Sequence, residues 1–178
     1  MPKLYEEITD GLKEFIGQQK LFFVATADTG GRINLSPKGG DTLRVHGKNR
    51  VLWLNLTGSG NETAAHMLAM NRITIMFCSF EGSPTILRLY GKGKVIHEND
   101  PDWDQLISQF PENTGARQIF DITVDFIQTS CGFQVPLYGY EGERDLLDKW
   151  SVKKGRDGIR LYWEEKNKLS LDGKPTGI

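Results

Sequence analysis

Short apolar runs separated by glycine-containing turns constrain the fold of this chain more than any other feature. The sequence has 20 glycines in 178 residues, many of them in pairs or in turn contexts. They divide runs at 21–27, 51–56 and 72–80 that are rich in branched and aromatic residues. Closely spaced runs of this kind predict antiparallel strands joined by tight turns, because a parallel sheet needs a long crossover in every connection.

The whole chain, residues 1–178, is expected to form one domain that is mainly β with flanking helices. Its predicted strands are 21–27, 33–36, 43–46, 51–56, 72–80, 85–97 and 118–128. Pro37 limits the pairing of the second strand, while Gly91 and Gly93 mark a bulge or a bend in the long one. This succession of strands joined by tight turns favours a closed antiparallel barrel.

The strand predicted at 118–128 alternates and is expected to bury one face. Phe120, Ile122, Val124 and Phe126 form the apolar face, and the opposite face carries Ile119, Asp121, Thr123, Asp125 and Ile127. Helical periodicity predicts helices at 3–19, 61–70, 143–154 and 158–168. A short helix is expected to reach about Phe110, with Asp100 as its N-cap and Pro101 as its first residue. The last helices form an extension from about residue 142, and the tail at 170–178 is expected to be irregular.

Charge and composition narrow the class of function. With 22 basic and 23 acidic residues the net charge is -1, so the basic character of a nucleic-acid-binding domain is missing. No run reaches the roughly 18 apolar residues of a membrane span, and the charged N-terminus does not resemble a signal peptide. Cys78 and Cys131 are too few for a disulfide framework, so we expect a cytoplasmic protein with reduced thiols and no membrane contact.

The segment at 54–66 has the character of a phosphate site. An apolar strand runs into a glycine-rich turn and then into a helix, whose first N–H groups are free to bind an anion. Thr57, Ser59, Asn61 and Thr63 could add hydrogen bonds, although the lysine of a Walker A loop is absent. The alternative, which the local sequence alone favours, is an ordinary helix start with Ser59 or Asn61 as its cap.

A second candidate is the run NLSPKGG at 34–40, where a strand ends in proline beside a cation and two glycines. Such a strand end presents backbone groups to a planar ligand, with Lys38 available for negative charge. The local alternative, an edge strand that ends in a turn, is favoured about two to one.

The remaining reactive residues give weaker signals. His46, His66 and His97 lack a metal-binding spacing and are expected to be solvated or capping residues. A buried structural role is expected for Cys131, since no catalytic signature surrounds it. Arg88, between two leucines, either faces solvent or reaches a buried anion.

Several runs, taken in order, resemble the pyridoxamine 5′-phosphate oxidase-like family of FMN-binding split barrels. They are NLSPKGG at 34–40, VLWLNLTGSGNET at 51–63, RITIMFCSFEG at 72–82 and ILRLYGKGKV at 86–95. The resemblance covers about residues 3–130. The C-terminal runs DFIQTSCGFQVPLY at 125–138 and SLDGKPTG at 170–177 look like those of an uncharacterised branch of the same family.

The resemblance implies a six-stranded antiparallel split barrel that forms a homodimer, with two FMN sites at the dimer interface. It places the flavin ring along Asn34, Leu35, Ser36, Lys38 and Gly39. It places the ribityl chain and phosphate at Asn55, Thr57, Ser59, Gly60, Asn61 and Thr63, with Arg88 on the cofactor side. The segment 130–138 would reach the partner's site, and Gly39, Gly40, Gly58 and Gly60 would let backbone approach the cofactor.

This chain departs from the oxidases of the family in three places. Gly60 to Thr63 stand where those enzymes have an Arg-Lys pair for the phosphate, Lys38 is the only cation of its strand, and their C-terminal W-x-x-x-R-L-x-P pattern is absent. Pyridoxamine phosphate is therefore not expected to be the substrate. We expect an FMN-dependent oxidoreductase of unknown substrate, with Tyr90, Lys38 and Cys131 as candidate reactive groups and none assigned as catalytic. The alternatives are a non-enzymatic flavin-binding or stress-response module, and the same fold with a deazaflavin or haem.

Overall fold

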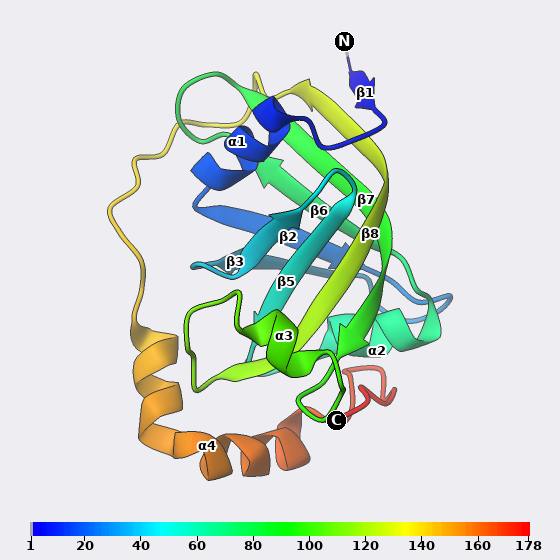
Figure 1. The fold of residues 1–178 in the computed structure, drawn as a ribbon, viewed down its shortest axis with the longest axis vertical. Coiled ribbons are helices and arrows are strands. Elements are labelled where there is room, and N and C mark those ends of the chain that lie inside the picture. The colour runs from blue at the N-terminus through cyan, green and yellow to red at the C-terminus, as the bar shows by residue number, and fades with distance from the viewer. Residues whose placement is uncertain (1) are drawn as a thin grey trace.

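One antiparallel sheet, curled into a half-barrel, forms the body of the protein (Figure 1). The computed structural model describes residues 2–178. The strands are β1 (Lys3–Tyr5), β2 (Leu21–Thr26), β3 (Asn34–Gly39), β4 (Leu43–His46), β5 (Arg50–Leu56), β6 (Ile73–Cys78), β7 (Thr85–Ile96) and β8 (Ala116–Cys131). They lie in the order β3-β2-β6-β7-β8-β5-β4, and β1 pairs with β8. The mainly β, antiparallel split-barrel prediction is confirmed, but the sheet has eight strands, not six.

Four helices flank the sheet: α1 (Asp10–Gln18), α2 (Glu62–Ala69), α3 (Trp103–Ile107) and α4 (Leu146–Lys166). In Figure 1, α2 and the far end of α4 lie below the sheet, and the C-terminal tail runs beside them. The position of α2 matches the helix predicted at 61–70.

The helix predicted at 3–19 is wrong in its first third. Residues 3–5 are a strand instead, because Leu4 and Tyr5 pair with Gln128 and Ile127 of β8. The helix starts only after Thr9, whose hydroxyl accepts a hydrogen bond from the backbone N–H of Leu12. A long-range strand pairing has therefore overridden the helical periodicity of these residues.

Strand β3 is an edge strand, and it continues through Pro37 to Gly39, beyond the predicted end at 36. Pro37 pairs with Phe23 of β2. An edge strand tolerates proline because the N–H that proline lacks would face away from the sheet.

A bulge in β8 reverses the predicted alternation near its end. Tyr90 pairs with Phe126 and Gly91 with Val124, which leaves Asp125 as the extra residue. As a result Phe126 is 44% exposed and Ile127 is fully buried, the opposite of the prediction. Gly91 is required here, because a Cβ at that position would lie 2.2 Å from the carbonyl oxygen of Thr123.

The two C-terminal helices are one element with a break. Gly155 has φ 68° and ψ 169°, so it separates two helical halves close to the boundary predicted between 154 and 158. The start of α3 differs from the prediction: Asp102 holds the N-cap position, and the Asp100 carboxylate instead accepts a hydrogen bond from the backbone N–H of His97.

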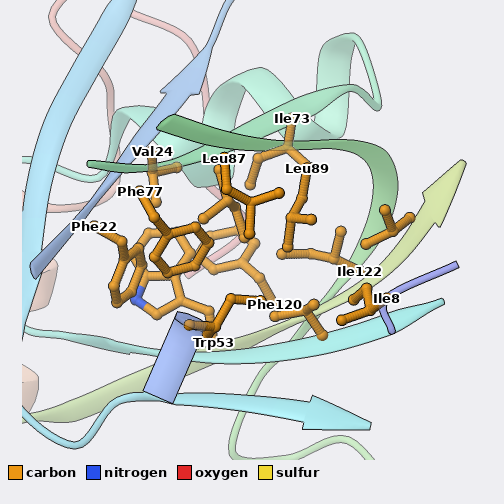
Figure 2. Close-up of a cluster of buried hydrophobic side chains, with 14 of the residues drawn as sticks. Ile8, Phe22, Val24, Trp53, Ile73, Phe77, Leu87, Leu89, Phe120 and Ile122 are labelled. Atoms are coloured by element: carbon orange, nitrogen blue, oxygen red, sulfur yellow. The ribbon is translucent and has the colours of Figure 1, made fainter. Parts of the chain in front are cut away.

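The main core lies inside the curled sheet (Figure 2). Trp53 stacks on Phe120 with ring centres 4.7 Å apart, and Phe22 meets the same indole edge-on at 6.2 Å. Leu87, Leu89 and Ile122 are fully buried beside them. Each such side chain contributes about 1.5–3 kcal/mol of transfer free energy on burial. This well-packed core supports the edge strand β3.

Candidate cofactor site

Alternate residues of β3 turn a row of polar side chains inward. Asn34, Ser36 and Lys38 are partly buried, whereas the residues between them are exposed. The Asn34 side-chain amide donates to the hydroxyl of Thr63 at 3.1 Å, which ties the start of β3 to the first turn of α2. The Ser36 hydroxyl is buried and has no hydrogen-bond partner among residues 2–178. The row therefore holds hydrogen-bonding capacity that the chain itself does not use.

Lys38 is the cation of this row. Its ammonium nitrogen lies 5.3 Å from the centre of the Trp53 ring, within the range of a cation–π interaction. Burial, and secondarily the charge of Arg117, lowers the pKa of Lys38 to about 8. None of the ion pairs formed within residues 2–178 includes Lys38.

Lys38 also lines a cavity of about 780 Å³. Its walls come from the end of β3 and the turn to β4, from Leu54 and Leu56 of β5, and from the segment 140–148 ahead of and at the start of α4. This cavity is large enough for a ligand of metabolite size.

The turn before α2 is held from within the chain. Thr57 is fully buried, its hydroxyl donates to the carbonyl of Gly115 at 2.8 Å, and it accepts from the indole N–H of Trp163 at 2.8 Å. The side-chain oxygen of Asn61 accepts a hydrogen bond from the side-chain amide of Gln118 at 2.7 Å. Two of the predicted phosphate ligands are thus already paired, and they fix the turn.

Arg117 and Asn167 complete this support. Arg117 donates to the carbonyl of Gly60 at 3.1 Å and to the Asn167 side chain at 2.7 Å, while Asn167 donates to the carbonyl of Gly58 at 3.1 Å. Burial lowers the pKa of Arg117 to about 10, and its Nε atom has no hydrogen-bond partner among the described residues. These bonds anchor the backbone carbonyls of Gly58 and Gly60 to β8 and to the residue that caps α4.

Sequence reasoning missed four residues of this support: Arg117, Gln118, Trp163 and Asn167. The available signal was the polar pair Arg117-Gln118 just ahead of an apolar strand, whereas nothing near Trp163 or Asn167 indicates a contact about one hundred residues away.

The first turn of α2 has no side-chain capping hydrogen bond. Asn61 holds the N-cap position, as the local alternative predicts, but its side chain makes no capping hydrogen bond. The Glu62 carboxylate accepts from the backbone N–H of Leu171 at 3.0 Å and 3.2 Å, so it is engaged with the C-terminal tail.

The other predicted ligands are placed separately. Asn55 is buried on β5, whereas Ser59 and Gly60 are exposed in the turn and Leu35 and Gly39 on the outer side of β3. Arg88 lies on β7, from which β2 and β6 separate β3, and it donates to the hydroxyl of Ser130 at 3.2 Å. The structure thus brings Asn34 and Thr63 together but leaves Arg88 elsewhere on the sheet.

Two expectations for reactive residues are wrong. Cys131 is exposed, because it is the last residue of β8, and Cys78 is the buried cysteine. His66 is buried and not solvated, with its Nδ1 atom 3.1 Å from the Thr26 hydroxyl. Within residues 2–178 no group of three or more His, Cys, Asp or Glu side chains is arranged to hold a metal ion. None of the helices described is long and apolar enough to cross a membrane.

Comparison with known proteins agrees with this fold. The family described as pyridoxamine 5′-phosphate oxidase matches residues 8–131. The pyridoxamine 5′-phosphate oxidase family protein ustO of Aspergillus flavus is 40% identical, over 98% of this chain and 78% of that protein. The chain therefore belongs to the pyridoxamine 5′-phosphate oxidase family.

Solved structures show the same fold at lower identity. A histidine-to-alanine variant of HupZ from Group A Streptococcus superposes with a TM-score of 0.57 at 22% identity, over 69% of this chain and 99% of that chain. A putative pyridoxamine 5′-phosphate oxidase from Lactobacillus delbrueckii gives 0.56 at 15% identity, over 69% and 94%. Each superposition covers 69% of this chain, and at these identities it supports the fold alone.

Proposed function

We propose that this protein is an FMN-binding flavoprotein that acts as an oxidoreductase. The observation that carries the proposal is the polar row of β3. The buried Ser36 hydroxyl has no hydrogen-bond partner and Lys38 has no ion-pair partner among the described residues, and Asn34 joins the row to the first turn of α2. Family membership makes a flavin nucleotide the natural candidate for those groups.

The residues present fit the chemistry of FMN. A phosphate suits the free N–H groups at the start of α2, which has eight residues and therefore a usable dipole. Lys38 and the hydroxyl and amide groups of Ser36 and Asn34 suit the polar edge of a planar ring. Thr57 and Asn61 act here by fixing the turn, since their side chains are bonded within the chain.

FMN, when bound, supplies hydride or electron transfer, and the protein's part is to bind and orient it. The proposal assigns no catalytic proton donor, and it leaves Tyr90, Lys38 and Cys131 as candidates.

A homodimer is part of the proposal. Ile33 is 77% exposed and Leu35 63%, both next to the cofactor row, and Phe133 and Leu137 are 78% and 77% exposed in the segment after β8. Large exposed apolar side chains of this kind are typical of an interface, and we expect a second copy of the chain to cover them. The cytoplasmic location stays a prediction.

The test is a visible spectrum of freshly purified protein together with an FMN titration. We expect the spectrum of an oxidised flavin and saturable binding at one FMN per chain; colourless protein without saturable binding would overturn the proposal. A haem or deazaflavin gives a different spectrum. Reduction of the bound flavin by NADH or NADPH, followed with oxygen or a dye, separates an oxidoreductase from a module that only stores flavin.

A further inference from the structure

The amine of Lys38 is unusual in its surroundings. It lies against the face of Trp53, partly buried at the wall of the 780 Å³ cavity, and no carboxylate within residues 2–178 forms an ion pair with it. The neighbouring charge that acts on it is another cation, Arg117. Lysines in such apolar, cation-flanked positions are the ones that act as nucleophiles toward carbonyl groups.

The acidic groups of the cavity are largely engaged elsewhere. Besides Lys38, six acidic or basic side chains line it, together with the phenol of Tyr140: Lys20, Asp41, Glu112, Glu143, Arg144 and Asp148. Asp41 pairs with Arg44, Glu143 accepts from the hydroxyl of Tyr140 at 2.7 Å, and Asp148 accepts from the amide of Asn113 at 2.9 Å. None of these carboxylates forms an ion pair with Lys38, and none is among the causes that shift its pKa.

The cavity also has an apolar part, which favours a ligand with an apolar body. Leu54, Leu56, Leu147 and Tyr140 contribute to its walls. A ligand here would carry a polar reacting group at the Lys38 end and an apolar or aromatic body toward the leucines.

We propose that this cavity binds an aldehyde with an apolar or aromatic body and that Lys38 captures it as an imine. The neutral amine nitrogen attacks the carbonyl carbon, and the carbonyl oxygen leaves as water after the amine protons move to it. The C=N bond forms as the C–O bond breaks, no electrons are exchanged, and hydrolysis returns the aldehyde and the lysine. Both proposals use Lys38, so this inference concerns the chain without bound flavin and is tested on FMN-free protein.

The lowered pKa agrees with this reactivity. With a pKa of about 8 in place of 10.5, Lys38 has about two orders of magnitude more neutral amine at neutral pH than an ordinary lysine. Lys20 provides a matched comparison in the same cavity, since it is exposed and its ammonium lies 5.4 Å from the ring centre of Tyr140.

The test uses the full-length protein, benzaldehyde as the probe and borohydride reduction to fix the imine, followed by peptide mapping. At pH 7.5 we expect Lys38 to be labelled at least tenfold faster than Lys20, with a rate that rises with pH to a midpoint near 8. Glyceraldehyde, which is polar, should label Lys38 more slowly than benzaldehyde. Equal labelling of Lys38 and Lys20 would overturn the proposal, and equal rates for the two aldehydes would overturn the apolar ligand class.

Variants give an independent measurement. Lys38→Met should lose the fast label, whereas Lys20→Met should keep it. Because the mapping of unmodified protein needs no variant, the proposal remains testable even where Lys38→Met fails to fold. The flavin titration is separate, so either proposal can fail without the other.

Discussion

The indole N–H of Trp163 donates a 2.8 Å hydrogen bond to the hydroxyl of Thr57, which joins the C-terminal helix to the turn that precedes α2. Thr57 in turn donates to the carbonyl of Gly115, so its hydroxyl is satisfied on both sides and fully buried. A residue about a hundred positions away thus fixes the shape of the proposed phosphate turn. This relation makes α4 part of the cofactor site's support.

Replacing Trp163 by phenylalanine keeps an aromatic ring but removes the donor. We expect Trp163→Phe to lower the free energy of unfolding by about 1–3 kcal/mol, because a buried hydrogen bond is lost and a smaller ring leaves space. Denaturant unfolding measures the change. Leu161→Ala, at an exposed position of the same helix, is the control and should change stability by less than about 0.5 kcal/mol. Equal effects of the two substitutions would contradict the role given to the Trp163–Thr57 bond.

The start of α2 gives the second prediction. The double variant Asn61→Ala, Thr63→Ala should weaken FMN binding by about tenfold or more. The first substitution removes the hydrogen bond between the turn and Gln118, and the second removes the hydrogen bond between Asn34 and α2. Fluorescence titration with FMN measures it, and thermal melting checks that the variant is folded. An unchanged affinity in a folded variant would count against this turn as the phosphate site.

Ser36 allows stability and binding to be separated. Its buried hydroxyl has no partner in the chain described, so Ser36→Ala should leave the cofactor-free protein equally stable or up to about 1 kcal/mol more stable. The same variant should bind FMN several-fold more weakly if the hydroxyl serves the cofactor. Unfolding and titration on one preparation give both values. A loss of stability without a loss of affinity would assign Ser36 to the fold and not to the site.

The strand positions and α2 follow from the sequence because turn chemistry and periodicity are local properties. The bulge at Asp125 does not, since it arises from the pairing of β7 with β8 and reverses which of Phe126 and Ile127 is buried. Arg117 and Trp163 could not be identified from the sequence, because they contact the turn before α2 only through the tertiary fold. In the candidate site, the family resemblance assigned the β3 residues to the cofactor, whereas their own segment favoured an edge strand, which β3 is. The residues that hold the site in place come from other parts of the chain.

Gly91 makes the bulge testable. Gly91→Ala should cost several kcal/mol of unfolding free energy, because the new Cβ would lie 2.2 Å from the Thr123 carbonyl and backbone would have to move. Gly11→Ala is the matched control: nothing lies within 4 Å of that Cβ, and alanine in a helix should raise stability by up to about 1 kcal/mol. Urea unfolding of both variants checks the pair. A mild effect at Gly91 would mean that the strand register shown at the bulge is incorrect.

The lowered pKa of Lys38 predicts how stability changes with pH. The folded protein holds this proton less tightly than the unfolded chain does, so burial of the charged amine costs stability below pH 8, where both states are protonated. That cost, roughly 3 kcal/mol at most, is relieved as pH rises from about 8 toward 10.5, where both states become neutral. Lys38→Met lacks the charge and should be more stable than the wild type at pH 7, by a margin that shrinks steadily toward pH 10. Urea unfolding of the two proteins across this range measures the difference in their unfolding free energies. The titration of all other groups largely cancels in that difference. A margin that does not depend on pH would show that the Lys38 amine is solvated, and it would also remove the support that the lowered pKa lends to imine formation.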